Sequence, residues 1–191
     1  YHPDYTHNVF RGWYDFGGGS FVDMGHYSLF ALFESFGITR PAVSATANAT
    51  QVREMNGHTF RKVAFDATYP YSSAIHLKMP EQPTMEAFDL YWYDGGVKPF
   101  LPKEMEADYR EVPEEGMFFV GDKGRILTGF SGTAPRILPL DRMRRYKGLK
   151  TVKGGDNSTY NTFPWIDHLH DRTPLPGSFI RAKTVTETIN L

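Results

Sequence analysis

The feature that most constrains the fold is a long stretch, from Pro41 to about Leu127, in which apolar and polar side chains alternate with period two. Five segments carry the pattern and are separated by turn residues: SATANAT, TFRKVAFDATY, SAIHLKM, AFDLYWYD and MFFVGDKGRILTGF. Such alternation is typical of strands with one buried face. No helical pattern lies between these segments, so we expect them to pair mostly antiparallel.

Two glycine-containing turns divide this stretch. The segment Gly121–Gly124 separates MFFV from RILTGF, and Asp94–Gly96 follows LYWY. Glycine adopts positive φ without steric cost, so both segments predict hairpin turns. Asp94 is accordingly predicted to form a turn rather than to bind a ligand.

Helical spacing appears on either side of the strands. Apolar residues recur at helical intervals from Ser20 to Phe36, with Ser20 as the expected N-cap and Gly37 as the C-terminal stop. Glycine inside a helix weakens it by up to about 1 kcal/mol relative to alanine. We therefore expect a packing partner or a ligand to approach the backbone at Gly25.

The C-terminal part of the chain is predicted to be helical twice, over residues 162–171 and 178–191. Residues 141–158 are basic and contain glycine, which favours a loop with about one helical turn. The order of helix, strands and helices indicates an α+β fold with one mostly antiparallel, open-faced sheet and helices packed on one side. A chain of 191 residues with 40% apolar content can form one large domain, residues 1–191.

Composition excludes several classes of function. A formal net charge of −1 provides no basic excess for binding a nucleic-acid backbone. No apolar run approaches the roughly 20 residues of a membrane span, and the first residues lack the order of a signal peptide. We expect a soluble chain without nucleic-acid or membrane partners, while a cytoplasmic and a periplasmic location stay equally open.

Metal chemistry is also not expected. The sequence has no cysteine, which removes thiolate ligands and disulfides. His168 and His170 are two residues apart in a predicted helix, so they point to different faces and make a poor metal pair.

Three consecutive glycines, Gly17–Gly19, precede the first predicted helix. A phosphate-binding loop needs such glycines at a helix N-terminus, but it also needs a preceding strand, and a carboxylate in the first turn repels phosphate. RGWYDF is a poor strand, and Asp23 lies near the helix start. One alternative is close packing of a bulky group against the glycine backbone, while the helix presents Asp23, His26 and Tyr27 together. The other is that Asp23 caps the helix end and that His26 and Tyr27 are ordinary partly buried side chains.

The segment GWYDFGGGSFVDMGHYSLFALF resembles the start of the C-terminal domain of the Gfo/Idh/MocA family of NAD(P)-dependent sugar and polyol oxidoreductases. In that family a glycine-rich turn leads into a helix bearing D-x-G-x-H. Three further segments, LYWYDGGVKP, MFFVGDKGRILTGF and PRILP, match the family in order and approximate spacing. The resemblance extends from about Phe10 to Leu191.

This resemblance implies an N-terminal Rossmann domain, absent from this chain, that holds NAD or NADP and a catalytic lysine. The present domain would then shape the pocket for a sugar or polyol and form a homo-oligomer through its open sheet. The chain opens at Tyr1 without a methionine, so we expect a fragment that does not catalyse hydride transfer alone. No G-x-G-x-x-G turn occurs in it.

The resemblance also implies catalytic residues. In the family, the carboxylate at the position of Asp23 and the side chain four residues later, usually histidine, face the substrate beside the nicotinamide. Here that later residue is Tyr27, and His26 lies one position earlier. A histidine with a pKa near roughly 6.5 suits proton transfer at neutral pH, whereas a tyrosine near roughly 10 needs a neighbouring cation. The two assignments compete; we favour Tyr27, as in the similar glucose-fructose oxidoreductase branch, which places tyrosine there beside a lysine.

Three residues before the glycines, Arg11, Trp13 and Asp15, are candidates for binding substrate, because aromatic rings stack on sugars and charged groups bind hydroxyls. The alternative is that Trp13 belongs to the core and that Arg11 pairs with Asp15. Two further functions also stay open. One is a glycosidase of the same superfamily that uses NAD for transient oxidation, and the other is a non-catalytic structural or sugar-binding module.

Overall fold

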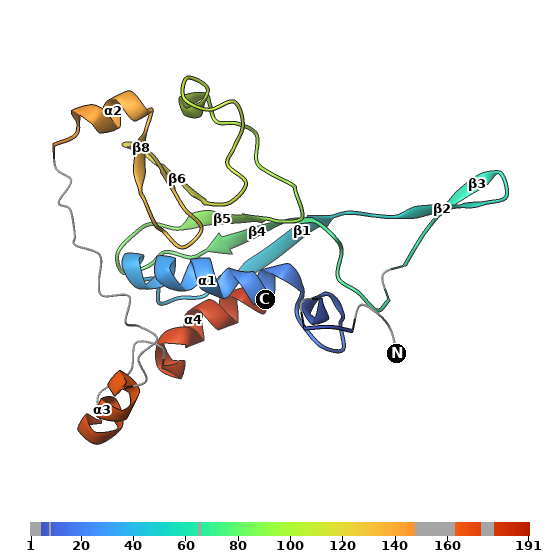
Figure 1. Cartoon of the computed structure of the whole chain (residues 1–191), viewed down its shortest axis with the longest axis horizontal. Coiled ribbons are helices and arrows are strands. Elements are labelled where there is room, and N and C mark those ends of the chain that lie inside the picture. Colours follow the sequence, from blue (N-terminus) through green and yellow to red (C-terminus); the bar gives the residue numbers. More distant parts are fainter. Residues whose placement is uncertain (1–4, 8, 65, 148–162, 173–177) are drawn as a thin grey trace.

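The computed structural model describes residues 5–7, 9–64, 66–147, 163–172 and 178–191 and has an α+β fold, as predicted (Figure 1). In chain order its elements are η1 (Phe10–Gly12), α1 (Gly19–Phe36), β1 (Ser44–Ala49), β2 (Arg53–Asn56), β3 (Thr59–Lys62), β4 (Ser73–Met79), β5 (Phe88–Tyr93), η2 (Lys103–Met105), β6 (Met117–Gly121), β7 (Gly124–Thr128), β8 (Arg136–Leu138), α2 (Leu140–Arg145), α3 (Phe163–Asp171) and α4 (Phe179–Ile189).

The strands form three open antiparallel sheets, with orders β1-β4-β5, β2-β3 and β6-β7-β8, instead of the single sheet expected. Two of the strands were not predicted. β2 has the sequence REMN, which offers no apolar alternation, and β8 has only three residues between two prolines. The predicted strand over residues 59–69 is short because β3 ends at Lys62.

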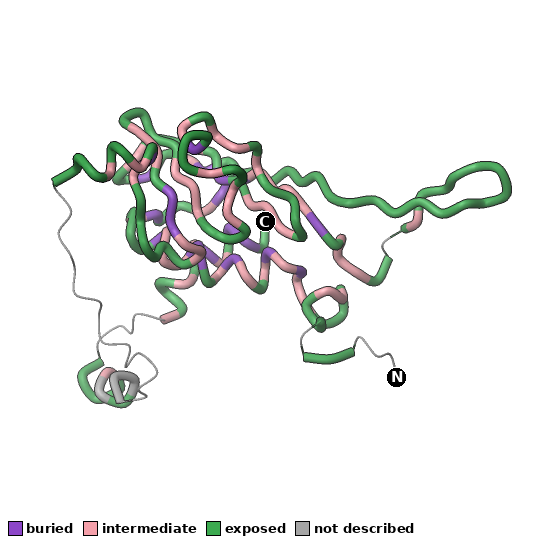
Figure 2. Tube along the Cα trace, turned by 45° about the horizontal axis from the view of Figure 1, so that its top comes forward, coloured by how far each residue is buried: buried purple, intermediate pink, exposed green. Residues whose placement is uncertain are grey.

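Helices cover one face of the β1-β4-β5 sheet, and α1 and α4 form that layer (Figure 1). Leu77 on β4 lies opposite Leu90 on β5, and both are buried beneath Phe21 and Phe33 of α1. Figure 2 shows the buried residues concentrated in this layer. Because strand side chains alternate between faces, the opposite face carries polar and aromatic groups.

Helix α1 begins at Gly19, two residues before the start that Ser20 as N-cap would give. Its N-cap is Gly18, without a side-chain hydrogen bond, so the assignment of Ser20 as N-cap is wrong. The physical reason is that the glycine run already provides the turn into the helix, which leaves Ser20 inside the first turn. The C-terminal stop is confirmed, because Gly37 has φ 63° and its N–H donates to the carbonyl oxygen of Phe33.

The internal glycine of α1 marks the point where α4 packs. A Cβ atom at Gly25 would lie 3.3 Å from Cδ1 of Ile189 and 3.2 Å from the ring of Phe21. The expected close approach is therefore packing of another helix. Glycine allows the two helix axes to come closer than a larger residue would.

Polar contacts complete the attachment of α4. The hydroxyl of Thr188, which is fully buried, accepts a hydrogen bond of 3.1 Å from the backbone N–H of Ala42. Arg181 forms an ion pair of 3.2 Å with Glu34 of α1. The two predicted C-terminal helices are confirmed as α3 and α4, although residue 162 lies outside the described residues.

The β6-β7-β8 sheet has its own small core. Buried Met105, Leu127 and Leu138 form that core, and Phe119 packs on Phe36 at the end of α1 with 5.6 Å between ring centroids. The hairpin turn at Gly121–Gly124 is confirmed, with those two glycines as register partners. Helix α2 supplies the helical turn expected within residues 141–158, of which 148–158 lie outside the described residues.

The second predicted turn, Asp94–Gly96, is also confirmed, with φ 61° at Gly95 and 87° at Gly96. Asp94 does more than form a turn. Its carboxylate accepts hydrogen bonds from the N–H of Ser73 at 2.7 Å, the hydroxyl of Ser73 at 3.0 Å and the indole N–H of Trp92 at 2.9 Å. These contacts join the start of β4 to the end of β5.

None of the helices in the described part of the chain combines the length and the apolar character needed to cross a membrane.

Candidate functional site

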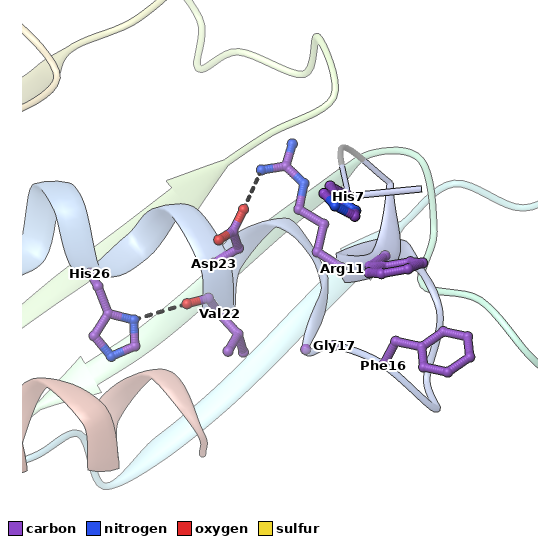
Figure 3. Close-up of a pocket in the computed structure, with 9 residues that line it drawn as sticks. His7, Arg11, Phe16, Gly17, Val22, Asp23 and His26 are labelled. Atoms are coloured by element: carbon purple, nitrogen blue, oxygen red, sulfur yellow. Dashed lines mark hydrogen bonds and ion pairs between the residues drawn. The ribbon is translucent and has the colours of Figure 1, made fainter. Parts of the chain in front are cut away.

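A cavity of about 480 Å³ opens at the N-terminus of α1 (Figure 3). Its walls come from η1, the glycine run and the first two turns of α1. The lining residues are His7, Phe10, Arg11, Phe16, Gly17, Gly18, Val22, Asp23 and His26. Three of the six predicted site residues, Arg11, Asp23 and His26, therefore lie around one cavity.

The glycine run is explained by close packing. A Cβ atom at Gly17 would lie 2.5 Å from the Cα atom of Arg11, and one at Gly18 would lie 2.5 Å from Cβ of Val22. Gly19 has φ 78°, and a Cβ atom there would meet the ring of Tyr69 at 2.9 Å. Gly17 thus allows Arg11 of η1 to pack closely against the glycine run, which sets the position of Arg11, whereas Gly18 and Gly19 make room for Val22 and Tyr69.

Arg11 and Asp23 form an ion pair across the cavity, with 2.7 Å between Nη1 and Oδ2 (Figure 3). The alternative pairing of Arg11 with Asp15 is wrong, because the glycine-enforced approach of η1 to α1 directs the guanidinium to Asp23. The two side chains are 42% and 46% exposed. An ion pair this exposed contributes between about 0 and 1 kcal/mol to stability, so it is free to exchange partners with a ligand.

His26 leaves α1 on a different side from Asp23 and points toward α4 (Figure 3). Its Nδ1 lies 2.9 Å from the carbonyl oxygen of Val22, and a carbonyl only accepts, so Nδ1 carries the hydrogen. In the neutral ring Nε2 is then the basic nitrogen, and it accepts a hydrogen bond of 3.4 Å from the hydroxyl of Thr186. Both ring nitrogens of His26 are thus engaged within the protein.

Tyr27 lies on the uncovered side of α1 and is 65% exposed. It follows Asp23 by four residues, so the two side chains occupy neighbouring turns of one helix face. Tyr27 is not among the residues that line the cavity. The helix therefore presents an exposed carboxylate and an exposed phenol in one stripe, while His26 points from another side of the helix toward α4.

The remaining two candidates lie beside the cavity and do not line it. Trp13 forms an antiparallel bridge with Thr68 and packs edge-on against Tyr5, with 5.0 Å between ring centroids. Asp15 is exposed in the turn before the glycines. Trp13 thus has a packing role.

Sequence reasoning missed four side chains that line the cavity, His7, Phe10, Phe16 and Val22. Phe10 and Phe16 pack on each other at 5.5 Å, which folds the segment before α1 back over the helix start. The signal was the density of aromatic residues before the glycine run. In the described segments, no group of three or more histidine or acidic side chains could hold a metal ion.

No protein-family model matches this chain, and no curated protein matches it significantly.

Proposed function

We propose that this chain is the substrate-binding and oligomerisation domain of a Gfo/Idh/MocA-like oxidoreductase that acts on a sugar or polyol with NAD or NADP. The observation that carries the proposal is the exposed Asp23–Tyr27 stripe of α1, with Arg11 paired to Asp23 at the rim of a cavity. The resemblance of the four sequence segments to the family also supports the proposal.

The described residues do not contain a Rossmann-type site for a nicotinamide dinucleotide. Such sites are built from parallel strands joined by a crossover helix, and each strand pair in the described part of the chain is antiparallel. The cofactor is therefore assigned to an N-terminal domain outside this chain, and this chain alone is expected to be inactive.

Arg11 and the two residues of the stripe, Asp23 and Tyr27, each have a chemical role in the proposal. The Arg11 guanidinium and the Asp23 carboxylate offer a donor and an acceptor 2.7 Å apart, which suits adjacent hydroxyl groups of a sugar. Tyr27 exchanges the proton of the reacting oxygen: the neutral phenol donates it, and the phenolate accepts it. A cation near the phenolate is required at neutral pH, and the proposal assigns it to the lysine of the N-terminal domain.

His26 is a weaker candidate for proton transfer. Its basic Nε2 faces Thr186 of α4, and its Nδ1–H is held by Val22. We therefore assign His26 a positioning role, in which it fixes the start of α1 against α4.

The test uses the full-length gene product that contains this chain. NAD and NADP are titrated by fluorescence quenching, and sugars and polyols are then screened by the absorbance of the reduced cofactor. Asp23→Asn and Tyr27→Phe are expected to abolish turnover, whereas His26→Gln is expected to retain it. Matched controls are Asp122→Asn, Tyr71→Phe and His58→Gln, which alter exposed residues away from the cavity.

Two outcomes would overturn the proposal. Absence of NAD and NADP binding by the full-length protein would favour a non-catalytic module. Hydrolysis of an aryl glycoside that requires NAD, without accumulation of NADH, would favour the NAD-dependent glycosidase.

Oligomer formation is the second part of the proposal, through the uncovered face of the β1-β4-β5 sheet. On that face His76 stacks on Tyr91 with 4.5 Å between ring centroids and contacts Asp89 at 2.6 Å. Tyr91 is 54% exposed. An exposed aromatic cluster on a strand face is typical of an interface, and Tyr91→Ser is expected to weaken association in sedimentation experiments.

A further inference from the structure

The β2-β3 hairpin projects from the body of the protein as an isolated arm (Figure 1). Each residue of the two strands is exposed, and Figure 2 shows the arm without buried positions. β2 and β3 pair with each other and with no other described strand. With a rise of about 3.3 Å per residue, the tip at Asn56 lies about 20 Å beyond Thr50.

An isolated two-stranded hairpin is at best marginally stable in water. This arm also exposes large apolar side chains to solvent, so their burial contributes little to stability. Met55 and Phe60 lie directly opposite each other and are 61% and 68% exposed. A pair of this kind is typical of a surface that becomes buried in a complex.

The two faces of the arm differ in charge. Because side chains alternate along a strand, Arg53, Met55, Phe60 and Lys62 share one face. The other face carries Glu54 and Arg61, which form an ion pair with each other. Arg53 and Lys62 are cross-strand neighbours without an ion pair among the described residues, so the apolar pair is flanked by two unneutralised cations.

A surface with the complementary character exists on the same chain. The segment 104–115, EMEADYREVPEE, contains six carboxylates and one arginine. Glu104 pairs with Arg125, and Asp108 accepts a hydrogen bond from the backbone of Leu140, but Glu111 and Glu114 are exposed.

An exposed aromatic side chain lies close to this acidic segment in sequence. Phe100 is 99% exposed, and nearby Lys98 contacts the acidic loop by donating to the carbonyl oxygen of Val112 at 3.3 Å. This region thus combines negative charge with an exposed apolar side chain, Phe100. The arm combines positive charge with the apolar pair Met55 and Phe60. Residues 97–116 lie over the body, and the arm points away from it, so a contact between the two would join neighbouring molecules (Figure 1).

We propose that the β2-β3 arm docks on the acidic segment 104–115 and Phe100 of a second copy of this chain. In a two-fold arrangement each arm uses the same surface on the other copy, so every contact occurs twice. Arg53 and Lys62 meet Glu111 and Glu114, and the Met55–Phe60 pair packs on Phe100. This contact is separate from the proposed interface on the uncovered sheet face and does not depend on the proposed enzyme activity.

The test is the oligomeric state of the full-length protein in sedimentation velocity over micromolar concentrations. Wild type is expected to form dimers or larger assemblies. The arm variant Arg53→Glu/Lys62→Glu and the loop variant Glu111→Lys/Glu114→Lys are each expected to weaken association by about tenfold or more. All four positions are exposed, so the variants keep the fold.

The decisive measurement is made on a mixture of the arm variant and the loop variant. The reversed arm of one variant then faces the reversed loop of the other, so a mixed assembly is expected to form more tightly than either variant with itself. Met55→Ser/Phe60→Ser is expected to weaken association without altering its salt dependence. The matched control Lys123→Glu/Arg144→Glu reverses two exposed charges elsewhere and is expected to assemble as wild type does.

Three results would overturn the inference. The first is a monomeric wild type, and the second is assembly that the arm variant leaves unchanged while Tyr91→Ser abolishes it. The third is failure of the mixture to assemble although each variant alone has lost association.

Discussion

Asp94 gives the sharpest test of how the main sheet is held together. Its carboxylate joins β4 to β5 by accepting from the backbone and hydroxyl of Ser73 and from the indole of Trp92. In Asp94→Asn the amide oxygen can keep the contacts to Ser73. The amide NH₂ then faces the indole N–H of Trp92, so one donor meets another and the hydrogen bond is lost.

The magnitude follows from the charge of the acceptor. A hydrogen bond to a charged group contributes about 1.5–3 kcal/mol, and a part-buried donor without a partner adds to the loss. We therefore expect Asp94→Asn to lower the free energy of unfolding by about 2–3 kcal/mol. For a chain of this size that corresponds to a decrease in Tm of about 4–12 °C.

The assay is urea unfolding followed by tryptophan fluorescence, with the full denaturation curve fitted for both the midpoint and the slope. The midpoint is expected to fall by roughly 1 M with an unchanged slope, because the variant changes stability and not the surface exposed on unfolding. Asp122→Asn is the matched control, since Asp122 is an exposed aspartate in the other hairpin turn. Its effect is expected to stay within about 0.5 kcal/mol. Equal losses in both variants, or no loss in Asp94→Asn, would refute the reasoning.

Three further predictions concern the packing and polar contacts described above. Gly19→Ala is expected to destabilise by about 1–3 kcal/mol more than Gly57→Ala in thermal unfolding, because both have positive φ but only Gly19 faces a ring, that of Tyr69 at 2.9 Å; equal losses would contradict it. Gln82→Glu is expected to destabilise by about 2 kcal/mol or more in urea, because Nε2 of the buried Gln82 donates to the carbonyl oxygens of Arg40 and Pro80 and a carboxylate cannot donate; wild-type stability would count against it. Arg11→Leu is expected to change the free energy of unfolding by less than about 1 kcal/mol while it abolishes turnover of the full-length protein; intact turnover would remove Arg11 from the site.

The α+β class, the longer strands and the main helices could be predicted because their signals are local. Period-two alternation marks β4 and β5, and helical spacing ended by Gly37 marks α1. The division into three sheets could not be predicted in this way. It depends on where the chain leaves the main sheet after β1, and the polar sequence of β2 gives no burial pattern from which to infer that departure.

The candidate site was predicted in part. Asp23, His26 and Arg11 lie around one cavity because the glycine run brings η1 onto α1. The partner of Arg11 was missed, since pairing across a turn depends on the three-dimensional path of the segment and not on sequence distance. Helical geometry alone predicted that Tyr27 shares a face with Asp23, but the orientation of His26 toward α4 required the position of a helix 160 residues later in the chain.

The most direct test of the proposed function is the formation of reduced nicotinamide by the full-length protein, measured with the best sugar or polyol for wild type, Tyr27→Phe and the control Tyr71→Phe. The proposal predicts turnover in wild type and in the control, and its loss in Tyr27→Phe with cofactor binding unchanged. Turnover that persists in Tyr27→Phe at the wild-type rate would contradict the assignment of Tyr27. No reduction of NAD or NADP with any sugar or polyol would contradict the oxidoreductase itself.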